Sequence, residues 1–242
     1  MFRFDGSRIL VAGGSSGIGL ATARLLASLG AKVVIGGRDE AKLERAAASG
    51  SISTLAFDAT DPSSRAEALA KAGAIDHLVL ALSGGKGGGP FPTLRSADLR
   101  GAFDAKFWAH YSLAQEALGY LRKDGSVTFV SAISARIAGP GTAGLSAVNA
   151  AIEALVKPLA MELRPLRVNA VAPGIVDTPW WDSYDPETKK AIFDGFAART
   201  PAGRNGRPED IATAIVFLMG NTFMTGAVIE CDGGLRLAGS LG

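Results

Sequence analysis

Ile9-Leu10-Val11-Ala12-Gly13-Gly14-Ser15-Ser16-Gly17-Ile18-Gly19 combines an apolar strand, a glycine-rich turn and the start of a helix. Gly13, Gly17 and Gly19 lie in the turn, where missing side chains let the backbone bend tightly and let a pyrophosphate approach the amides of a helix N-terminus. The two serines between them can add hydroxyl donors. A bare tight turn is the alternative, but the position of the glycines between a strand and a helix favours a dinucleotide site.

Short apolar runs alternate with helical patterns along the rest of the chain, which indicates βαβ units and a parallel sheet. We expect seven strands, at Arg8–Ala12, Lys32–Gly36, Ile52–Phe57, His77–Leu82, Ser126–Ser131, Arg167–Val171 and Ala227–Cys231. Their unalternating, β-branched character predicts helices on both faces. We therefore predict one doubly wound Rossmann-type domain over residues 1–242, a three-layer α/β/α fold with a mainly parallel seven-stranded sheet. Gly84–Pro92 is rich enough in glycine and proline to form a flexible loop.

Composition excludes several classes of protein. The 242 residues are 48% hydrophobic and 20% charged, with a net charge of +2, enough apolar material for one large core. Because acids and bases are interspersed, we expect neither a nucleic-acid partner nor a membrane surface. Cys231 is the only cysteine, which excludes an internal disulfide, argues against a metal cluster and fits the cytoplasm. We expect no signal peptide and no span of the roughly 20 apolar residues that cross a bilayer.

The end of the second expected strand bears on the choice of cofactor. A site for NAD usually places an acid there, against the ribose 2′-hydroxyl, whereas this chain has glycine followed by Arg38. A guanidinium can form bidentate, charge-assisted contacts with a 2′-phosphate, which favours NADP(H). The alternative is an ion pair of Arg38 with Asp39 or Glu40 in solvent. Asp58, which closes the third strand, is placed either to meet the adenine edge or to act as a cap or turn residue.

Motifs spread along the whole chain carry a resemblance to a known family. They are Gly13–Gly19, Asp58, Val168–Gly174, Gly203–Asp210, and Thr225-Gly226 with Asp232–Gly234. With these motifs the chain resembles a short-chain dehydrogenase/reductase from end to end. The resemblance implies a nicotinamide-dependent oxidoreductase, a substrate lid at about residues 177–200, and a homodimer or homotetramer. The expected cofactor contacts are Gly13, Ser15, Ser16, Gly17, Ile18, Gly19, Arg38, Asp58, Ala59, Ser83, Gly84, Pro173, Gly174, Ile175 and Thr178.

The residues expected to perform the family's reaction depart from its pattern. That reaction uses a tyrosine as acid or base, a lysine four residues later, a serine at the preceding strand end and an asparagine in an earlier helix. Matching the helix places the tyrosine position on Leu145 and the lysine position on Asn149. Leucine has no proton to give, and asparagine can bond a ribose but carries no charge. The serine position falls on Ala132, which leaves Ser131 or Ser134 as substitutes.

Lys106 occupies the position where the family carries asparagine, so lysine and asparagine have exchanged helices. Our hypothesis is that Lys106 reaches the vacated site and pairs with Asn149. There it either binds the nicotinamide ribose or, with a pKa lowered by burial, acts as the acid. A solvated lysine on a helix face is the alternative. His110, one turn later, is expected to be a packing or surface residue.

The expected lid is rich in aromatic residues. Trp180 and Trp181 follow the nicotinamide strand, and Phe193 and Phe196 recur on the expected lid helix. An aromatic wall of this kind, together with Leu145, predicts a small apolar or aromatic carbonyl or alcohol as substrate. The alternative is that the tryptophans cover the core or a subunit boundary.

Three classes of function compete on these residues. The first is an atypical NADPH-dependent oxidoreductase, favoured by the intact cofactor motifs. The second is an NADP(H)-binding sensor or scaffold without catalysis, suggested by Leu145 and Asn149. The third is a non-redox enzyme in the same pocket, although no new nucleophile-base pair is evident. Net turnover of the cofactor separates the first class from the other two.

Overall fold

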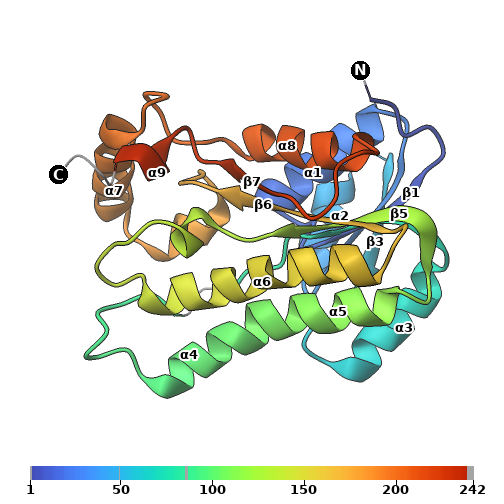
Figure 1. The fold of residues 1–242 in the computed structure, drawn as a ribbon, viewed down its shortest axis with the longest axis horizontal. Coiled ribbons are helices and arrows are strands. Elements are labelled where there is room, and N and C mark those ends of the chain that lie inside the picture. The colour runs from blue at the N-terminus through green and yellow to red at the C-terminus, as the bar shows by residue number, and fades with distance from the viewer. Residues whose placement is uncertain (1, 49, 85–86, 239–242) are drawn as a thin grey trace.

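The computed structural model describes residues 2–48, 50–84 and 87–238. In these residues the seven expected strands form one sheet in the order β3-β2-β1-β4-β5-β6-β7, with every neighbouring pair parallel (Figure 1). The strands are β1 (Arg8–Ala12), β2 (Lys32–Gly37), β3 (Ile52–Ala56), β4 (Ile75–Leu80), β5 (Leu121–Val130), β6 (Arg167–Pro173) and β7 (Val228–Cys231). The predicted doubly wound α/β fold is confirmed, and its described strands are all parallel.

Helices cover both faces of the sheet. They are α1 (Gly17–Ser28), α2 (Glu40–Ala47), α3 (Pro62–Ala72), α4 (Ser96–Ala102), α5 (Ala109–Ala117), α6 (Ala143–Glu162), α7 (Pro186–Arg199), α8 (Pro208–Gly220) and α9 (Leu235–Ala238). Successive side chains of a strand point to opposite faces. Leu10 and Ala12 of β1 therefore join a core with α3, α5 and α6, whereas Ile9 and Val11 join a second core with α1, α2 and α8.

Two strand and helix ends show how local chemistry sets the boundaries. Gly30 follows α1 with a φ of +92°, a left-handed conformation that glycine adopts readily at a helix end, as predicted. β5 begins at Leu121 instead of Ser126, because Leu121 pairs with Ile75 across an irregular register. The polar residues between Leu121 and Ser126 gave no strand pattern in the sequence.

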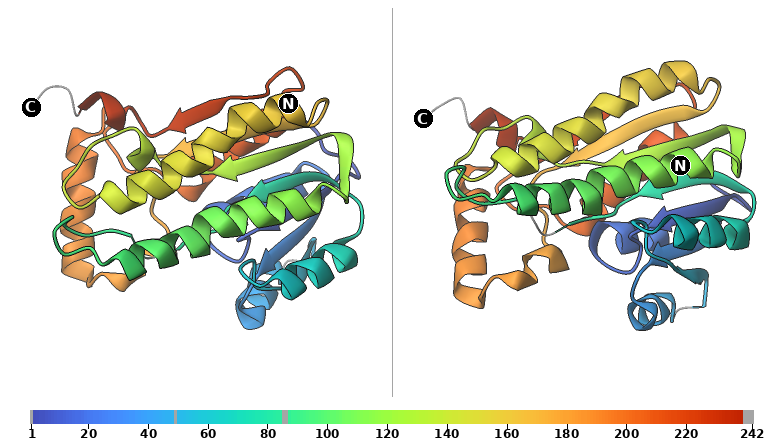
Figure 2. Two further views of the ribbon diagram at one scale, coloured as in Figure 1. Left: turned by 60° about the horizontal axis from the view of Figure 1, so that its bottom comes forward. Right: turned by 90° about the horizontal axis from the view of Figure 1, so that it is seen from below.

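The long rod on one face of the sheet contains an irregular turn. α4 and α5 are joined without a break by a π-helical segment, η1 (Phe103–Trp108), which carries Lys106. Figure 2 shows this rod lying beside α6 across the same face of the sheet. π-Helical turns inside α-helices are rare and occur often at functional sites. The π turn in the middle of this rod is therefore a candidate part of a functional site.

The expected lid is a short 3₁₀ turn, η3 (Pro179–Ser183), followed by α7. Figure 2 shows α7 at the end of the molecule toward which the strands point. The expected loop at Gly84–Pro92 lies partly outside the described residues. Across the described ranges, none of the helices is both long enough and apolar enough to span a membrane.

Candidate active site

The glycine turn between β1 and α1 has the geometry of a phosphate cradle. Gly13 has a φ of +82°, and a Cβ on it would lie 2.5 Å from the Ala81 carbonyl oxygen. A Cβ on Gly19 would collide with the Gly13 carbonyl, so α1 starts directly against the turn. Ser16 precedes the helix without a side-chain capping bond, which leaves first-turn amides uncapped by that side chain. These residues fit the pyrophosphate of a dinucleotide.

Arg38 lies at the end of β2, beside the same turn. A Cβ on the neighbouring Gly37 would lie 3.7 Å from Ser15 Oγ, so the end of β2 and the turn line one corner. Arg38 is exposed, and within the described chain it forms no ion pair with Asp39 or Glu40. The Asp39 carboxylate instead caps the N-terminus of α2. The corner therefore has a cation that a 2′-phosphate can approach.

Asp58 and Ala59 differ in how far they face this corner. The Asp58 carboxylate accepts hydrogen bonds from the Thr60 backbone amide at 2.9 Å and hydroxyl at 2.8 Å. The amide bond is the main reason for the lowered pKa of Asp58, and Arg38 contributes a weaker attraction. Asp58 therefore forms bonds within its turn, and its contact with the adenine edge stays a prediction. Ala59 is buried, and its carbonyl accepts from Arg65 at 3.0 Å.

Lys106 and Asn149 meet near the carboxyl ends of β4 and β5. The Lys106 ammonium donates to Asn149 Oδ1 at 2.6 Å and to the Ser131 carbonyl oxygen at 3.3 Å. Asn149 is buried, and its amide nitrogen donates to Ser134 Oγ at 3.1 Å and to the Leu145 carbonyl at 2.9 Å. Both ends of the Asn149 amide are therefore fixed, with its oxygen aimed at Lys106. The pairing expected from the sequence is present, and the solvated lysine is excluded.

Burial lowers the pKa of Lys106 to about 8. Desolvation disfavours the ammonium, and both described partners of Lys106 are neutral oxygens. A lysine whose pKa lies near neutral pH can donate a proton and later regain one, which suits an acid-base catalyst. It also retains enough charge at pH 7 to bind a hydroxyl or an oxyanion.

The two candidate serines separate in the structure. Ser131 donates its hydroxyl to Glu153 Oε1 at 2.8 Å and to the Val171 carbonyl at 3.3 Å, so only its backbone carbonyl belongs to the Lys106 group. Ser134 accepts from Asn149 and is the hydroxyl in contact with that group. Ser134 is therefore the candidate whose hydroxyl contacts this group, Ser131 contributes its carbonyl oxygen, and a catalytic role of either serine stays a prediction.

Leu145 packs beneath the glycine-rich loop that follows β4. Its side chain lies 3.8 Å and 3.6 Å from the positions that a Cβ would take on Gly87 and Gly88. The Gly89 amide donates to the Gly141 carbonyl at 2.9 Å, which fastens this loop to the start of α6. An apolar side chain and bare backbone therefore adjoin Lys106 and Asn149, with no hydroxyl at position 145.

The segment after β6 approaches the cradle from the other side. Gly174 packs closely against Asp232, where a Cβ would come within 2.7 Å of its Cα. The Thr178 side chain lies 3.2 Å from the position of a Cβ on Gly17. The expected nicotinamide segment, which starts at Pro173 and includes Ile175, thus runs from the sheet edge to the glycine turn.

The lid holds an aromatic cluster and touches the loop after β4. The ring of Trp181 packs against three other rings. The distances between ring centroids are 4.7 Å to Trp180, 5.7 Å to Tyr184 and 5.4 Å to Phe193. Trp180 donates its indole N–H to the Gly84 carbonyl at 3.5 Å, across the site from the glycine cradle. The segment expected to be the lid therefore contacts the loop after β4, and its role as a substrate lid stays a prediction. The expected aromatic wall includes Phe193, whereas Phe196 is paired with the Arg199 guanidinium. Ser83 is exposed beside Gly84.

Comparison with known proteins supplies the family. Residues 12–236 match the family described as enoyl-(acyl carrier protein) reductase. The chain belongs to the short-chain dehydrogenase/reductase family. It is 34% identical to the glucose 1-dehydrogenase of Gluconobacter oxydans, over 98% of this chain and 94% of that protein. It is 30% identical to the 3-oxoacyl-[acyl-carrier-protein] reductase FabG of Thermotoga maritima, over 96% of this chain and 99% of that protein.

A solved structure extends the likeness of this short-chain dehydrogenase/reductase to three dimensions. It is the crystal structure of a small-chain dehydrogenase in complex with NADPH, superposed with a TM-score of 0.85 at 32% identity. The match covers 96% of this chain and 100% of the other chain. The relatives named above are oxidoreductases, so the comparison supports an enzyme of that class.

Glu153 is a residue of this short-chain dehydrogenase/reductase that sequence reasoning missed. It accepts the Ser131 hydroxyl and forms an ion pair with Arg136 at 2.9 Å, so its carboxylate turns the serine side chain away from Lys106. Glu153 follows Asn149 by four residues in α6, so both lie on one face of the helix. This spacing is the sequence signal that could have predicted Glu153 as a residue of the site. Glu153 therefore holds the Ser131 hydroxyl, and the backbone carbonyl of Ser131 is the atom that accepts from the Lys106 ammonium.

Proposed function

We propose that this chain is an NADP(H)-dependent oxidoreductase of the cytoplasm that transfers hydride to or from a small apolar or aromatic carbonyl or alcohol. In this proposal Leu145 and Asn149 take the positions of the family's tyrosine and lysine. The observation that carries it is the 2.6 Å contact between Lys106 Nζ and Asn149 Oδ1, because it returns a cation to a site that has lost its lysine.

The preference for NADP(H) rests on Arg38. Its exposed guanidinium stands beside Ser15 and the glycine turn, where a 2′-phosphate would form charge-assisted bonds with it. The last residue of β2, at the position where an acid would accept from a ribose 2′-hydroxyl, is Gly37. A similar dehydrogenase was solved with NADPH, which supports the same choice here.

Lys106 has the chemistry of the proton donor in this proposal. Asn149 Oδ1 and the Ser131 carbonyl accept two of its three ammonium hydrogens, which leaves one for the substrate oxygen or a ribose hydroxyl. After the substrate oxygen takes that proton, the remaining amine keeps both of its held hydrogens. The nicotinamide supplies the hydride when it is bound. General acid assistance contributes about 10²–10⁴ in rate, so the reaction depends on Lys106 without requiring a tyrosine.

The substrate class follows from the surfaces around Lys106. Leu145 offers an apolar side chain where a hydroxyl would otherwise stand, and the aromatic cluster of Trp180 and Trp181 approaches from the lid. Apolar walls with few polar groups favour small hydrophobic ligands. In this proposal the Ser134 hydroxyl, which accepts from Asn149, lies near the substrate oxygen together with the Lys106 ammonium.

A cofactor-binding sensor or scaffold without catalysis is the second candidate. Leu145 favours it, because leucine cannot donate a proton and Lys106 is already held by two acceptors. The sensor would bind a partner with an affinity that depends on the redox state of NADP(H). The enzyme would instead oxidise NADPH in step with substrate.

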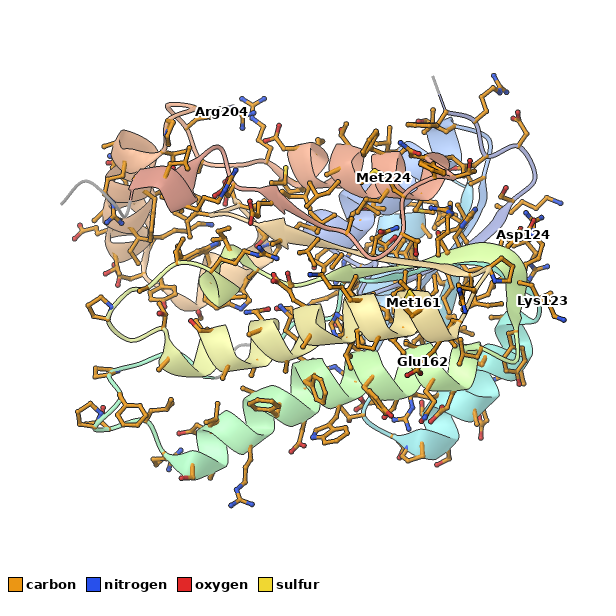
Figure 3. All side chains as sticks on the ribbon, viewed as in Figure 1. Lys123, Asp124, Met161, Glu162, Arg204 and Met224 are labelled. Carbon is orange, nitrogen blue, oxygen red and sulfur yellow. The ribbon has the colours of Figure 1, made fainter. Side chains whose placement is uncertain are left out.

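We also propose that the chain forms a homodimer or homotetramer through the outer face of η1 and α6. Trp108 of η1 is 50% exposed, and Met161 of α6 is 64% exposed. Figure 3 labels Met161 on α6. Exposed large apolar groups on one face indicate an interaction surface. Light scattering of the wild type and of Trp108→Glu tests this assembly, and a monomeric wild type contradicts it.

The decisive experiment is a calorimetric titration with NADPH and NADH. The wild type should bind NADPH more tightly than NADH, and Arg38→Ala should remove most of that preference. Lys106→Ala should weaken both dinucleotides if the ammonium contacts the ribose. Oxidation of NADPH in a screen of apolar aldehydes and ketones then separates the enzyme from the sensor. No binding of either dinucleotide overturns both candidates.

A further inference from the structure

His110 is a fully buried, titratable residue that the proposed chemistry leaves unused. It lies on α5 one turn after Lys106, with a side chain that is 0% exposed. Its Nδ1 is 2.7 Å from the Lys106 carbonyl oxygen, and its Nε2 is 3.0 Å from the Leu80 carbonyl oxygen. The ring stacks on Phe129 of β5 at a centroid distance of 6.2 Å. The imidazole therefore spans the gap between the rod and the sheet.

The two carbonyls that His110 contacts both belong to segments that border the candidate site. Leu80 is the last residue of β4, at the edge of the sheet where the candidate site lies. Lys106 belongs to the π-helical turn η1, in which the backbone hydrogen bonds of a regular α-helix are interrupted. The Lys106 carbonyl already accepts from the Ala109 backbone N–H, so the His110 ring is a second neighbour of that carbonyl.

The charge on His110 follows from its surroundings. Burial, and secondly the nearby Lys106, lower the pKa of His110 to about 3, so the ring is neutral at physiological pH. The groups that face it from β4 and β5 are the Leu80 carbonyl and Phe129, and neither titrates. A neutral imidazole carries one N–H, so only one of the two contacts is a hydrogen bond. With that hydrogen on Nε2, the ring donates to the Leu80 carbonyl and links the rod to β4. The ring therefore adds no cation beside Lys106.

We propose that His110 is a positioning residue that holds the π-helical turn in the register that brings Lys106 against Asn149. A π turn contains more residues than an α turn, so a return to regular α-helix would rotate Lys106 away from α6. In the tautomer that carries its hydrogen on Nε2, His110 opposes this return by anchoring the start of α5, directly after the turn, to the Leu80 carbonyl at the end of β4. The catalytic consequence rests on the proposed function, whereas the positioning itself is testable without turnover.

The test compares His110→Phe with His110→Gln and a matched control, His77→Phe. Phenylalanine keeps the ring and its stacking on Phe129 but removes both contacts to carbonyls. Glutamine keeps an amide donor in the same core. His77 is the other histidine of the chain, buried in β4 and bonded to Ser126 at 2.8 Å, so its loss reports the general effect of removing a core histidine.

The first measurement is the pH dependence of reductive methylation of Lys106 in the cofactor-free protein, followed by mass spectrometry. The wild type should be half-reactive near pH 8, in line with the lowered pKa of Lys106. In His110→Phe this midpoint should rise by more than about one unit toward the value of a free lysine. His110→Gln should fall between the two, and His77→Phe should match the wild type.

The second measurement is NADPH affinity. It should fall about tenfold in His110→Phe, as expected for one lost charged hydrogen bond, and not in His77→Phe. If His110→Phe does not fold, His110→Gln decides on the same two readouts. An unchanged Lys106 midpoint and affinity in the folded variants overturn the proposal, as does an equal effect of His77→Phe. If Lys106→Ala binds NADPH normally while His110→Phe still shifts the Lys106 midpoint, the positioning stands and the proposed function fails.

Discussion

At the scale of single residues, the proposed chemistry depends on Lys106, which lies on a different helix from the lysine of the family's pattern. Lys106 reaches Asn149 from a different helix, and its neutral partners and burial lower its pKa to about 8. A lysine in solvent, with a pKa near 10.4, would remain protonated through the whole physiological range. In the proposed function, Lys106 is therefore an acid whose pKa lies near the physiological range.

The pH dependence of turnover tests this role. The ammonium is the proton donor in the reductive direction, so reduction should be constant below about pH 8 and fall tenfold per unit above it. Oxidation of the alcohol should show the opposite sign, because it needs the neutral amine. Steady-state rates from pH 6 to 10 in both directions check this. A profile without a change near pH 8 excludes Lys106 as the titrating group.

Lys106→Arg separates proton donation from ribose binding. Arginine keeps the positive charge but does not deprotonate in this range, so it can bind a hydroxyl and cannot act as an acid. We expect NADPH affinity within a few-fold of wild type and a kcat lower by about 10²–10⁴. Titration and turnover of the same preparation measure both. An arginine variant with wild-type kcat would leave Lys106 with the binding role alone.

Residue positions were predicted better than residue orientations. The pairing of Lys106 with Asn149 followed from their positions in the family's pattern, because two helices on one sheet face bring those positions together. The choice between Ser131 and Ser134 did not follow, since it depends on which way a hydroxyl points. Glu153, which lies on the same face of α6 as Asn149, fixes that orientation by accepting the Ser131 hydroxyl hydrogen.

At the scale of elements, the sequence predicted regular structure and missed irregular structure. The seven strands were predicted from apolar runs, which directly reflect burial on both faces. The π turn at Phe103–Trp108 had no such signal, because its composition suits an ordinary α-helix. The contact of the His110 ring with Leu80 of a distant strand is a tertiary contact, and local propensity does not contain it.

The lid is an element whose order depends on a small cluster. Trp181 contacts three other rings and donates its indole N–H to the Val176 carbonyl at 3.0 Å, which fastens η3 to the end of the sheet. α7 itself contains no fully buried residue. The ion pairs of Lys189 with Asp177 and Asp182 are largely exposed and contribute little. The aromatic cluster therefore supplies most of the cohesion of this segment.

Trp181→Ala should release the lid without unfolding the molecule. We expect faster amide exchange over 179–199 and a raised KM, with little change in the exchange of β1 and β4. Hydrogen exchange with mass spectrometry measures both regions. Trp108→Ala is the matched control, because Trp108 is half exposed on η1 and remote from the lid cluster. Equal effects of the two variants on residues 179–199 would contradict a specific role of Trp181.

At the scale of the whole molecule, stability depends on two cores that share one sheet, and each core contains a buried histidine. His77 contacts Ser126 within the sheet, and burial lowers its pKa to about 4. His110 lies beneath the candidate site, with a pKa lowered to about 3. Both are neutral in the folded chain at neutral pH, whereas an unfolded histidine titrates near 6.5. Folding is thus coupled to proton release in mildly acidic solution.

The sign of this coupling gives a prediction for unfolding. Between pH 6.5 and about 4 the unfolded chain binds more protons than the folded chain, so stability falls as the pH falls through this window. At pH 5 each histidine should lower the free energy of unfolding by about 2 kcal/mol relative to neutral pH. Urea unfolding at pH 7.5 and pH 5 measures the sum. In His77→Phe about half of the pH dependence should be lost, whatever its effect on stability at pH 7.5.

Carboxylates with lowered pKa, such as Asp58 and Asp210, act below this window because their unfolded values lie near 3.8. A pH dependence that is unchanged in His77→Phe would therefore place the titrating groups elsewhere.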